Sequence, residues 1–71
     1  MRKRTIIKAK REFKRIRMER GISRIDIAIA AGCSSAFIGM LENRETGIKE
    51  TKAQKISIFF NLPFSDLFVI K

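Results

Sequence analysis

The side chains best suited to binding chemistry are the Lys and Arg residues at the start of the chain. Residues 1–20 hold ten Lys and Arg against two acidic residues, a balance of +8 within a formal net charge of +9. Such side chains bind phosphates, and neutralising a nucleic-acid backbone releases its counterions. The asymmetry predicts a polyanionic partner, and the alternative is a solvating tail. We expect residues 1–8 to form a basic N-terminal arm that contacts DNA through Arg2, Lys3 and Arg4, ahead of a domain over residues 9–71.

Catalytic chemistry lacks its usual side chains. The sequence has no His, Trp or Tyr and one cysteine, Cys33. General acid–base schemes, Cys–His nucleophiles and zinc sites therefore each miss a part. We predict no enzyme, no cofactor and no metal site, and we expect Cys33 to be a buried core thiol. No apolar run is long enough to cross a membrane, so we expect a cytoplasmic protein without a membrane partner.

Helical patterns account for most of the chain. Apolar spacing, N-capping residues and the breakers Gly21, Gly32 and Gly47 predict five helices. Ser23 is expected to cap the second, Ser34 or Ser35 the third, and Ser65 the last. We place these helices at about 9–20, 24–31, 34–41, 50–60 and 66–68, with a polar turn at 42–48. The result is an all-α single domain.

The second and third helices meet at the triplet Gly32-Cys33-Ser34. Two helices cross closely at about 90–120° only when the turn is tight and the crossing residue is small. Gly32 allows the turn through a positive φ, and Ala28 allows the approach. The residues expected to point inward at helical spacing are Ile27, Cys33, Ile38 and Leu41.

From about Phe13 to Phe68 the sequence resembles phage-repressor and Cro-like regulators of the xenobiotic-response-element type. The resemblance rests on the order and spacing of short motifs: Phe13–Arg17, Gly21–Arg24, Ile27-Ala28, Gly32–Ser34, Ile38, Glu42-Asn43, Ile56 and Asp66–Phe68. It implies a five-helix, lambda-repressor-like DNA-binding domain. It further implies a two-fold dimer with the third helix in the major groove and the second across the backbone.

The resemblance also implies a DNA-binding face. Arg24 matches a position that touches phosphate, and Asn43 with Arg44 would hold the next phosphates. The exposed side of the recognition helix, about Ser34–Leu41, would comprise Ser34, Ser35, Ala36, Phe37, Gly39 and Met40. Family members commonly have Gln, Arg or Asn there, which pair with bases. Direct readout is therefore predicted to be weak, and we expect specificity from Arg44, the arm or DNA shape, with a preference for A/T-rich or bendable sites.

One apolar feature departs from this pattern, and a second concerns the two ends of the chain. Ile25, Ile29, Ile58 and Phe59 stand where the family usually has polar residues. We expect some of them to bury against the terminal segments; the alternative is an exposed patch for self-association or another protein. Residues 5–7 and 68–70 favour β structure and either pair as a two-stranded ribbon or, in the alternative, Ile6 and Ile7 extend the first helix.

These observations predict a sequence-selective double-stranded DNA-binding transcriptional regulator, a repressor, working as a homodimer at least on DNA. The alternative is a protein-interaction module on the same fold, antitoxin-like or antirepressor-like, which would explain the apolar residues. A third possibility is a non-specific architectural DNA binder driven by the basic front end.

Overall fold

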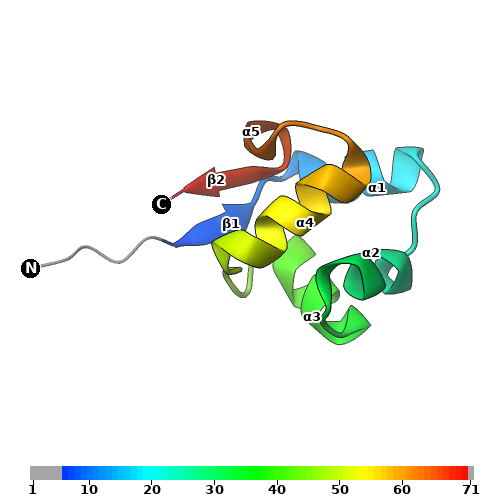
Figure 1. Ribbon diagram of the computed structural model, residues 1–71, viewed down its shortest axis with the longest axis horizontal. Coiled ribbons are helices and arrows are strands. Elements are labelled where there is room, and N and C mark those ends of the chain that lie inside the picture. Colours follow the sequence, from blue (N-terminus) through cyan, green and yellow to red (C-terminus); the bar gives the residue numbers. More distant parts are fainter. Residues whose placement is uncertain (1–5, 71) are drawn as a thin grey trace, which may run out of the picture.

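The computed structural model describes residues 6–70 as five helices and a two-stranded ribbon (Figure 1). In chain order the elements are β1 (Ile7–Ala9), α1 (Glu12–Glu19), α2 (Arg24–Ala31), α3 (Ser35–Glu42), α4 (Glu50–Phe60), α5 (Phe64–Leu67) and β2 (Phe68–Ile70). The five predicted helices are confirmed. The predicted arm residues Arg2, Lys3 and Arg4 lie outside the described residues.

The ribbon brings the two ends of the described chain together (Figure 1). β1 and β2 are antiparallel, with Ile7 opposite Ile70 and Ala9 opposite Phe68. The carbonyl of Ile7 also accepts the N–H of Ile48 at 2.9 Å, which holds the loop before α4 against β1. The ribbon prediction is therefore confirmed, although the first strand runs from residue 7 to 9. Because Ala9 belongs to β1, α1 begins at Glu12, three residues later than expected.

Phenylalanine rings form the centre of the core. Phe13 of α1 lies 5.7 Å from both Phe60 of α4 and Phe68 of β2, measured between ring centroids. All three are fully buried, whereas Phe64 is half-buried against the same cluster. Aromatic burial of this kind supplies much of the stability available to a chain of 71 residues. The core joins α1 and α4 to the ribbon.

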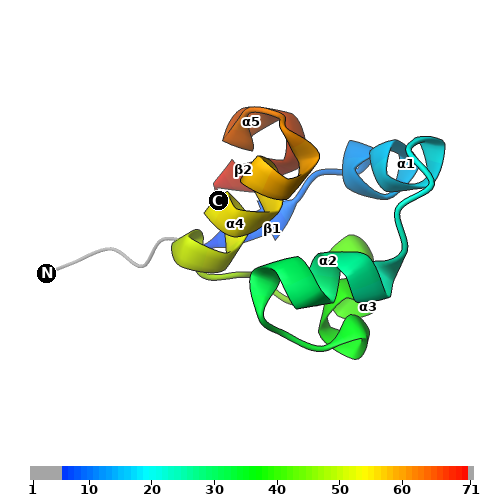
Figure 2. The same ribbon diagram turned by 45° about the vertical axis from the view of Figure 1, so that its right-hand side comes forward.

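The α2–α3 pair forms at the predicted turn. The two helices are bent by 107° relative to each other, inside the range typical of a helix-turn-helix. Gly32 has φ +75°, and the Oγ atoms of Ser23 and Ser34 accept the N–H groups of Asp26 and Phe37, each at 3.1 Å. Figure 2 shows α2 and α3 together on one side of α4, with α5 on the opposite side. Among residues 6–70, no single helix is long and apolar enough to span a membrane, and only this bent pair passes such a test jointly.

Three local predictions are corrected. Ser65 does not cap α5, because that helix already begins at Phe64, directly after Pro63. Glu42 is not the start of a polar turn, since it is the last residue of α3 and is buried. Cys33 is half-buried and packs against the core edge, so it is less enclosed than predicted.

A fourth correction concerns the apolar residues of α2 and α4. Ile25, Ile29, Ile58 and Phe59 are exposed by 59%, 75%, 78% and 43%. The sequence predicts that some of them bury against the terminal segments. Those segments instead pair with each other and with Ile48, and do not cover these side chains. The apolar residues therefore remain on the surface.

Candidate nucleic-acid interface

The third helix separates an inner from an outer face. Ile38, Leu41 and Glu42 point into the protein and are buried. Ser34, the N-cap of α3, is exposed, as are Ser35, Ala36 and Met40 of the helix itself. The structure thus brings most of the predicted recognition-helix residues to one surface. The local helical period that buries Ile38 and Leu41 also places these recognition-helix residues on the exposed side.

Two predicted members of this surface are only half-exposed. Phe37 packs against the edge of the core, and the ammonium of Lys52 lies 5.8 Å from its ring centroid. Gly39 is covered on its outer side by the guanidinium of Arg24. A Cβ placed on Gly39 would lie 3.6 Å from Arg24 Nη1, so the Arg24 side chain rests directly on α3.

A notch lies between the start of α2 and the outer face of α3. Its lining residues are Arg17, Ser23, Arg24, Ile25, Ser35, Ala36 and Gly39. The side of the notch that α3 contributes consists of Ser, Ala and Gly, which are too short to extend across it. The long polar side chains of the notch, Arg17 and Arg24, come instead from α1 and α2.

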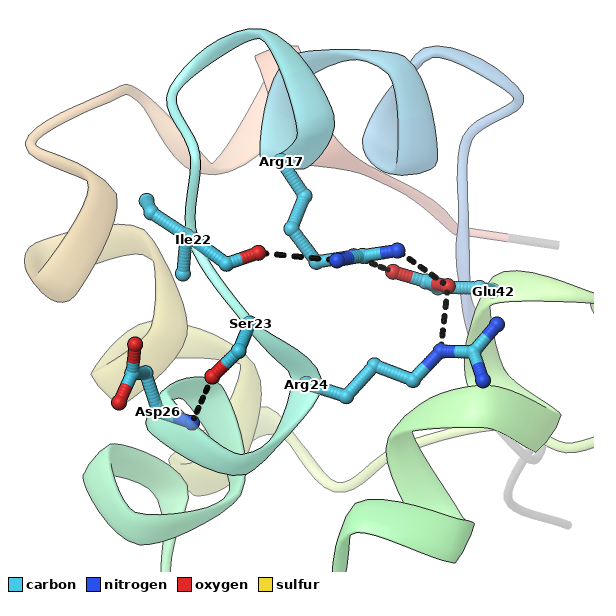
Figure 3. A network of polar contacts seen from close by, with 6 residues as sticks. All are labelled: Arg17, Ile22, Ser23, Arg24, Asp26 and Glu42. Atoms are coloured by element: carbon cyan, nitrogen blue, oxygen red, sulfur yellow. Dashed lines mark hydrogen bonds and ion pairs between the residues drawn. The ribbon is translucent and has the colours of Figure 1, made fainter.

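A buried carboxylate fixes both of these arginines (Figure 3). The side chain of Glu42 has no exposed surface, and it forms ion pairs with Arg17 Nε and, at 3.1 Å, with Arg24 Nε. Arg17 also donates through Nη1 to the carbonyl of Ile22 at 2.8 Å. A buried charge is tolerated only when it is paired and hydrogen-bonded. Glu42 therefore ties α1 and the start of α2 to the end of the recognition helix.

Sequence reasoning did not assign Glu42 a role. It quoted Glu42-Asn43 only as part of the family resemblance and placed Glu42 in a polar turn. The available signal was the helical period of α3, in which Glu42 follows buried Leu41 and lies four residues from buried Ile38. A carboxylate at the end of an apolar face requires a cationic partner.

A second hollow, rich in basic residues, lies beyond the C-terminal end of α3. Arg44 adopts a left-handed conformation, φ 60°, in the turn after the helix. The lining residues are Lys8, Ala9, Lys10, Arg11, Glu12, Asn43, Arg44 and Val69. Four cations thus surround one surface depression that contains a single carboxylate, an arrangement suited to a phosphate group. We call it the basic hollow.

Lys8, Lys10 and Arg11 were missed as site residues. The sequence prediction placed Lys8 in the basic N-terminal arm and Lys10 and Arg11 in the first helix, and it named none of them as a site residue. They reach Asn43 and Arg44 because β1 pairs with β2 and thereby holds the start of α1 beside the end of α3. No local sequence pattern indicates that these three residues lie beside the end of α3.

Other chemistry finds little support in residues 6–70. This part of the chain contains no group of three or more His, Cys, Asp and Glu side chains placed to hold a metal ion. Burial raises the pKa of the Cys33 thiol above its ordinary value, an effect only partly offset by the positive charge of Lys52. Cys33 is therefore a neutral thiol at pH 7 rather than a nucleophilic thiolate.

Comparison with known proteins agrees with this geometry. A helix-turn-helix family model of the Cro and C1 type matches residues 13–67, which covers α1 through α5. A search of curated proteins gives no match. The family consists of regulators that bind double-stranded DNA and is not an enzyme family. The chain belongs to the phage-repressor and Cro-like helix-turn-helix family, as a DNA-binding domain with the lambda-repressor-like fold.

Proposed function

We propose that this protein is a sequence-selective transcriptional regulator, a repressor, that places α3 in the major groove of its operator. The observation that carries this proposal is the position of α3. It lies between the notch that contains Arg24 and the basic hollow. A helix with an outward face of small residues fits closely into a groove about 12 Å wide. The cations of the basic hollow then lie where one phosphate backbone passes, and Arg24 lies at the opposite edge of α3.

Within this arrangement the contacts divide by role. Asn43, Arg44, Lys10 and Arg11 hold phosphates on one side of the groove and so fix the register of the domain on the duplex. Ser34, Ser35, Ala36 and Met40 approach the base edges, while Phe37 supports the helix from its half-buried position. Arg2, Lys3 and Arg4 follow the DNA beyond the domain. Repression then requires only that the operator be occupied.

Selection from a pool of random duplexes at physiological salt tests the proposal. We expect enrichment of a motif with two inverted half-sites whose centres are about 10 base pairs apart, the signature of a two-fold dimer. Binding without enrichment, combined with a steep salt dependence, would replace sequence selectivity by an architectural role. Absence of any binding would overturn the proposal.

The exposed apolar residues favour a second candidate function, a protein-interaction module of the antitoxin or antirepressor kind. Ile29 and Ile58 are exposed by 75% and 78% on α2 and α4, two helices that pack against each other. Exposed apolar side chains in such numbers are typical of a contact surface. Under this candidate a protein, in the simplest case a second copy of the chain, covers them.

The substitution Ile58→Asp tests this candidate. Because Ile58 contributes little to the core, the variant should keep the helical content and melting temperature of the parent. The contact-surface candidate predicts a shift from dimer to monomer in sedimentation equilibrium, with Lys55→Asp on the same helix as control. An unchanged oligomeric state for both proteins would exclude self-association through this residue.

A further inference from the structure

The outer face of α3 lacks the side chains that normally read bases. Ser35, Ala36 and Gly39 are small, and Met40 has no hydrogen-bond donor. A serine hydroxyl offers only one donor. If the protein selects its operator, as proposed, a bidentate pair of donors must therefore come from another side chain near α3.

Arg24 lies beside the outer face of α3 and carries such donors. Its Nε donates to Glu42 Oε1 at 3.1 Å, so the guanidinium is held toward α3 and not toward solvent beyond α2 (Figure 3). A Cβ on Gly39 would contact Arg24 Nη1, Cζ and Nε at 3.6, 3.8 and 3.9 Å. The guanidinium therefore lies over the backbone of α3, in the volume that a longer side chain at residue 39 would fill.

The donors of Arg24 divide into two sets. The Nε–H is used by Glu42, whereas Nη1 and Nη2 have no hydrogen-bond partner among residues 6–70. The side chain is 44% exposed and borders the notch, so this edge is open to a ligand. A guanidinium edge with two parallel N–H donors matches the O6 and N7 acceptors that guanine presents in the major groove.

We propose that Arg24, although it belongs to α2, is the base-reading residue of this domain and selects a guanine in the operator. The small size of Ser35, Ala36 and Gly39 leaves room beside α3 for both the Arg24 guanidinium and the base edge. Glu42 and Arg17 act as positioning residues, since they orient Arg24 before DNA binds and so lower the entropy lost on contact. This inference rests on the proposed function and replaces, for Arg24, the phosphate contact that the family resemblance implies.

The phosphate alternative makes a different prediction. A phosphate contact supports binding to every sequence, so its loss weakens all duplexes by a similar factor. A bidentate guanine contact supports one base at one position, by roughly 5- to 150-fold over the other three. A single panel of duplexes therefore distinguishes a loss of base preference at one position from a uniform loss of affinity for all duplexes.

The experiment uses the full chain, the motif found by selection, and duplexes carrying each base at each position. For the parent protein we expect one position that requires guanine, and replacing that base by 7-deazaguanine should remove most of the preference, because N7 is lost. For Arg24→Met we expect the preference at that position to fall to about twofold or less, with all other preferences unchanged. The matched control Arg44→Met should lower affinity for every duplex by a similar factor.

A second variant protects the test against loss of folding. Arg24→Lys keeps a cation beside Glu42, but a lysine cannot bind Glu42 and present a planar pair of donors to guanine at once. It should fold and show a reduced guanine preference. The inference is overturned if either folded variant keeps the guanine preference, or if the parent has none. In both cases DNA binding by the parent would leave the proposed function standing, whereas absence of binding by the parent would overturn both.

Discussion

At the residue scale, Glu42 shows how a buried charge is used in this domain. One carboxylate accepts ion pairs from helices α1 and α2 while itself ending α3. The pairs give orientation as well as stability, because each guanidinium is held toward Glu42 beside the surface where DNA is expected. A hydrophobic residue at position 42 would fill the space without orienting Arg24.

Glu42→Gln should strongly destabilise the domain. Removing one partner of a buried ion pair costs about 3–5 kcal/mol, chiefly because Arg17 is left without a compensating charge. The free energy of unfolding from urea titration measures the loss, and Glu45→Gln on the exposed turn should change it by less than about 0.5 kcal/mol. A similar small change for both variants would show that the buried pair contributes no net stability.

Cys33 provides a pH-dependent prediction. Burial raises its pKa, so folding favours the neutral thiol. Stability from this group is then fully present below the unfolded-state pKa of Cys33 and is lost as pH rises through the higher folded-state pKa. We expect iodoacetamide to modify the native protein more slowly than the urea-unfolded protein at pH 8, because less thiolate is present. Equal rates would contradict the raised pKa.

At the element scale, helix boundaries follow from side chains that cap the backbone. Ser23 and Ser34 accept the N–H groups of Asp26 and Phe37 in the same geometry, and Ser65 makes no such bond. Ser23→Ala and Ser34→Ala should each lower the free energy of unfolding by about 1 kcal/mol. Ser65→Ala should leave it within about 0.5 kcal/mol of the parent. Thermal or urea unfolding of the three variants decides the matter, and a loss for Ser65→Ala equal to the others would contradict it.

The elements that local signals specify were predicted well. Ser23, Gly32 and Ser34 delimit α2 and α3 by capping and turn chemistry within a few residues of each boundary. β1 is different, because Ile7–Ala9 becomes a strand only through pairing with Phe68–Ile70 at the far end of the chain. Sequence reasoning therefore left the strand and the helix alternatives open, and extended the first helix to Ala9.

The candidate site follows the same division. Ser35, Ala36 and Met40 were placed on the outer surface by the family resemblance, and the helical period of α3, which is a local property, exposes them. The pairing of Arg17 with Glu42, 25 positions apart, and the approach of Lys10 to Arg44 depend on tertiary packing. The exposure of Ile29 and Ile58 could not be predicted either, because a helical period identifies apolar faces but not which face another element covers.

At the scale of the whole molecule, the fold concentrates positive charge where the proposed function needs it. The ribbon holds Lys8 and Lys10 beside Arg44, so residues 8–11 and the end of α3 form one surface. The remaining residues, 21–71, carry six basic and five acidic side chains, and are nearly neutral. The domain can therefore approach DNA in a preferred orientation, steered by its own charge asymmetry.

Salt dependence measures how many of these charges meet phosphates. Each phosphate neutralised contributes about 0.9 to the slope of log K against log salt concentration. Lys10→Ala with Arg11→Ala should thus lower the slope by about 2, and deletion of residues 1–4 should lower it by up to about 3, with preferences at individual bases retained. Lys55→Ala, an exposed cation of α4 that lines neither the notch nor the basic hollow, should leave it unchanged. If the double variant leaves the slope unchanged, its cations displace no counterions on binding, and the basic hollow does not belong to the interface. If the deletion leaves the slope unchanged, the same conclusion holds for the arm.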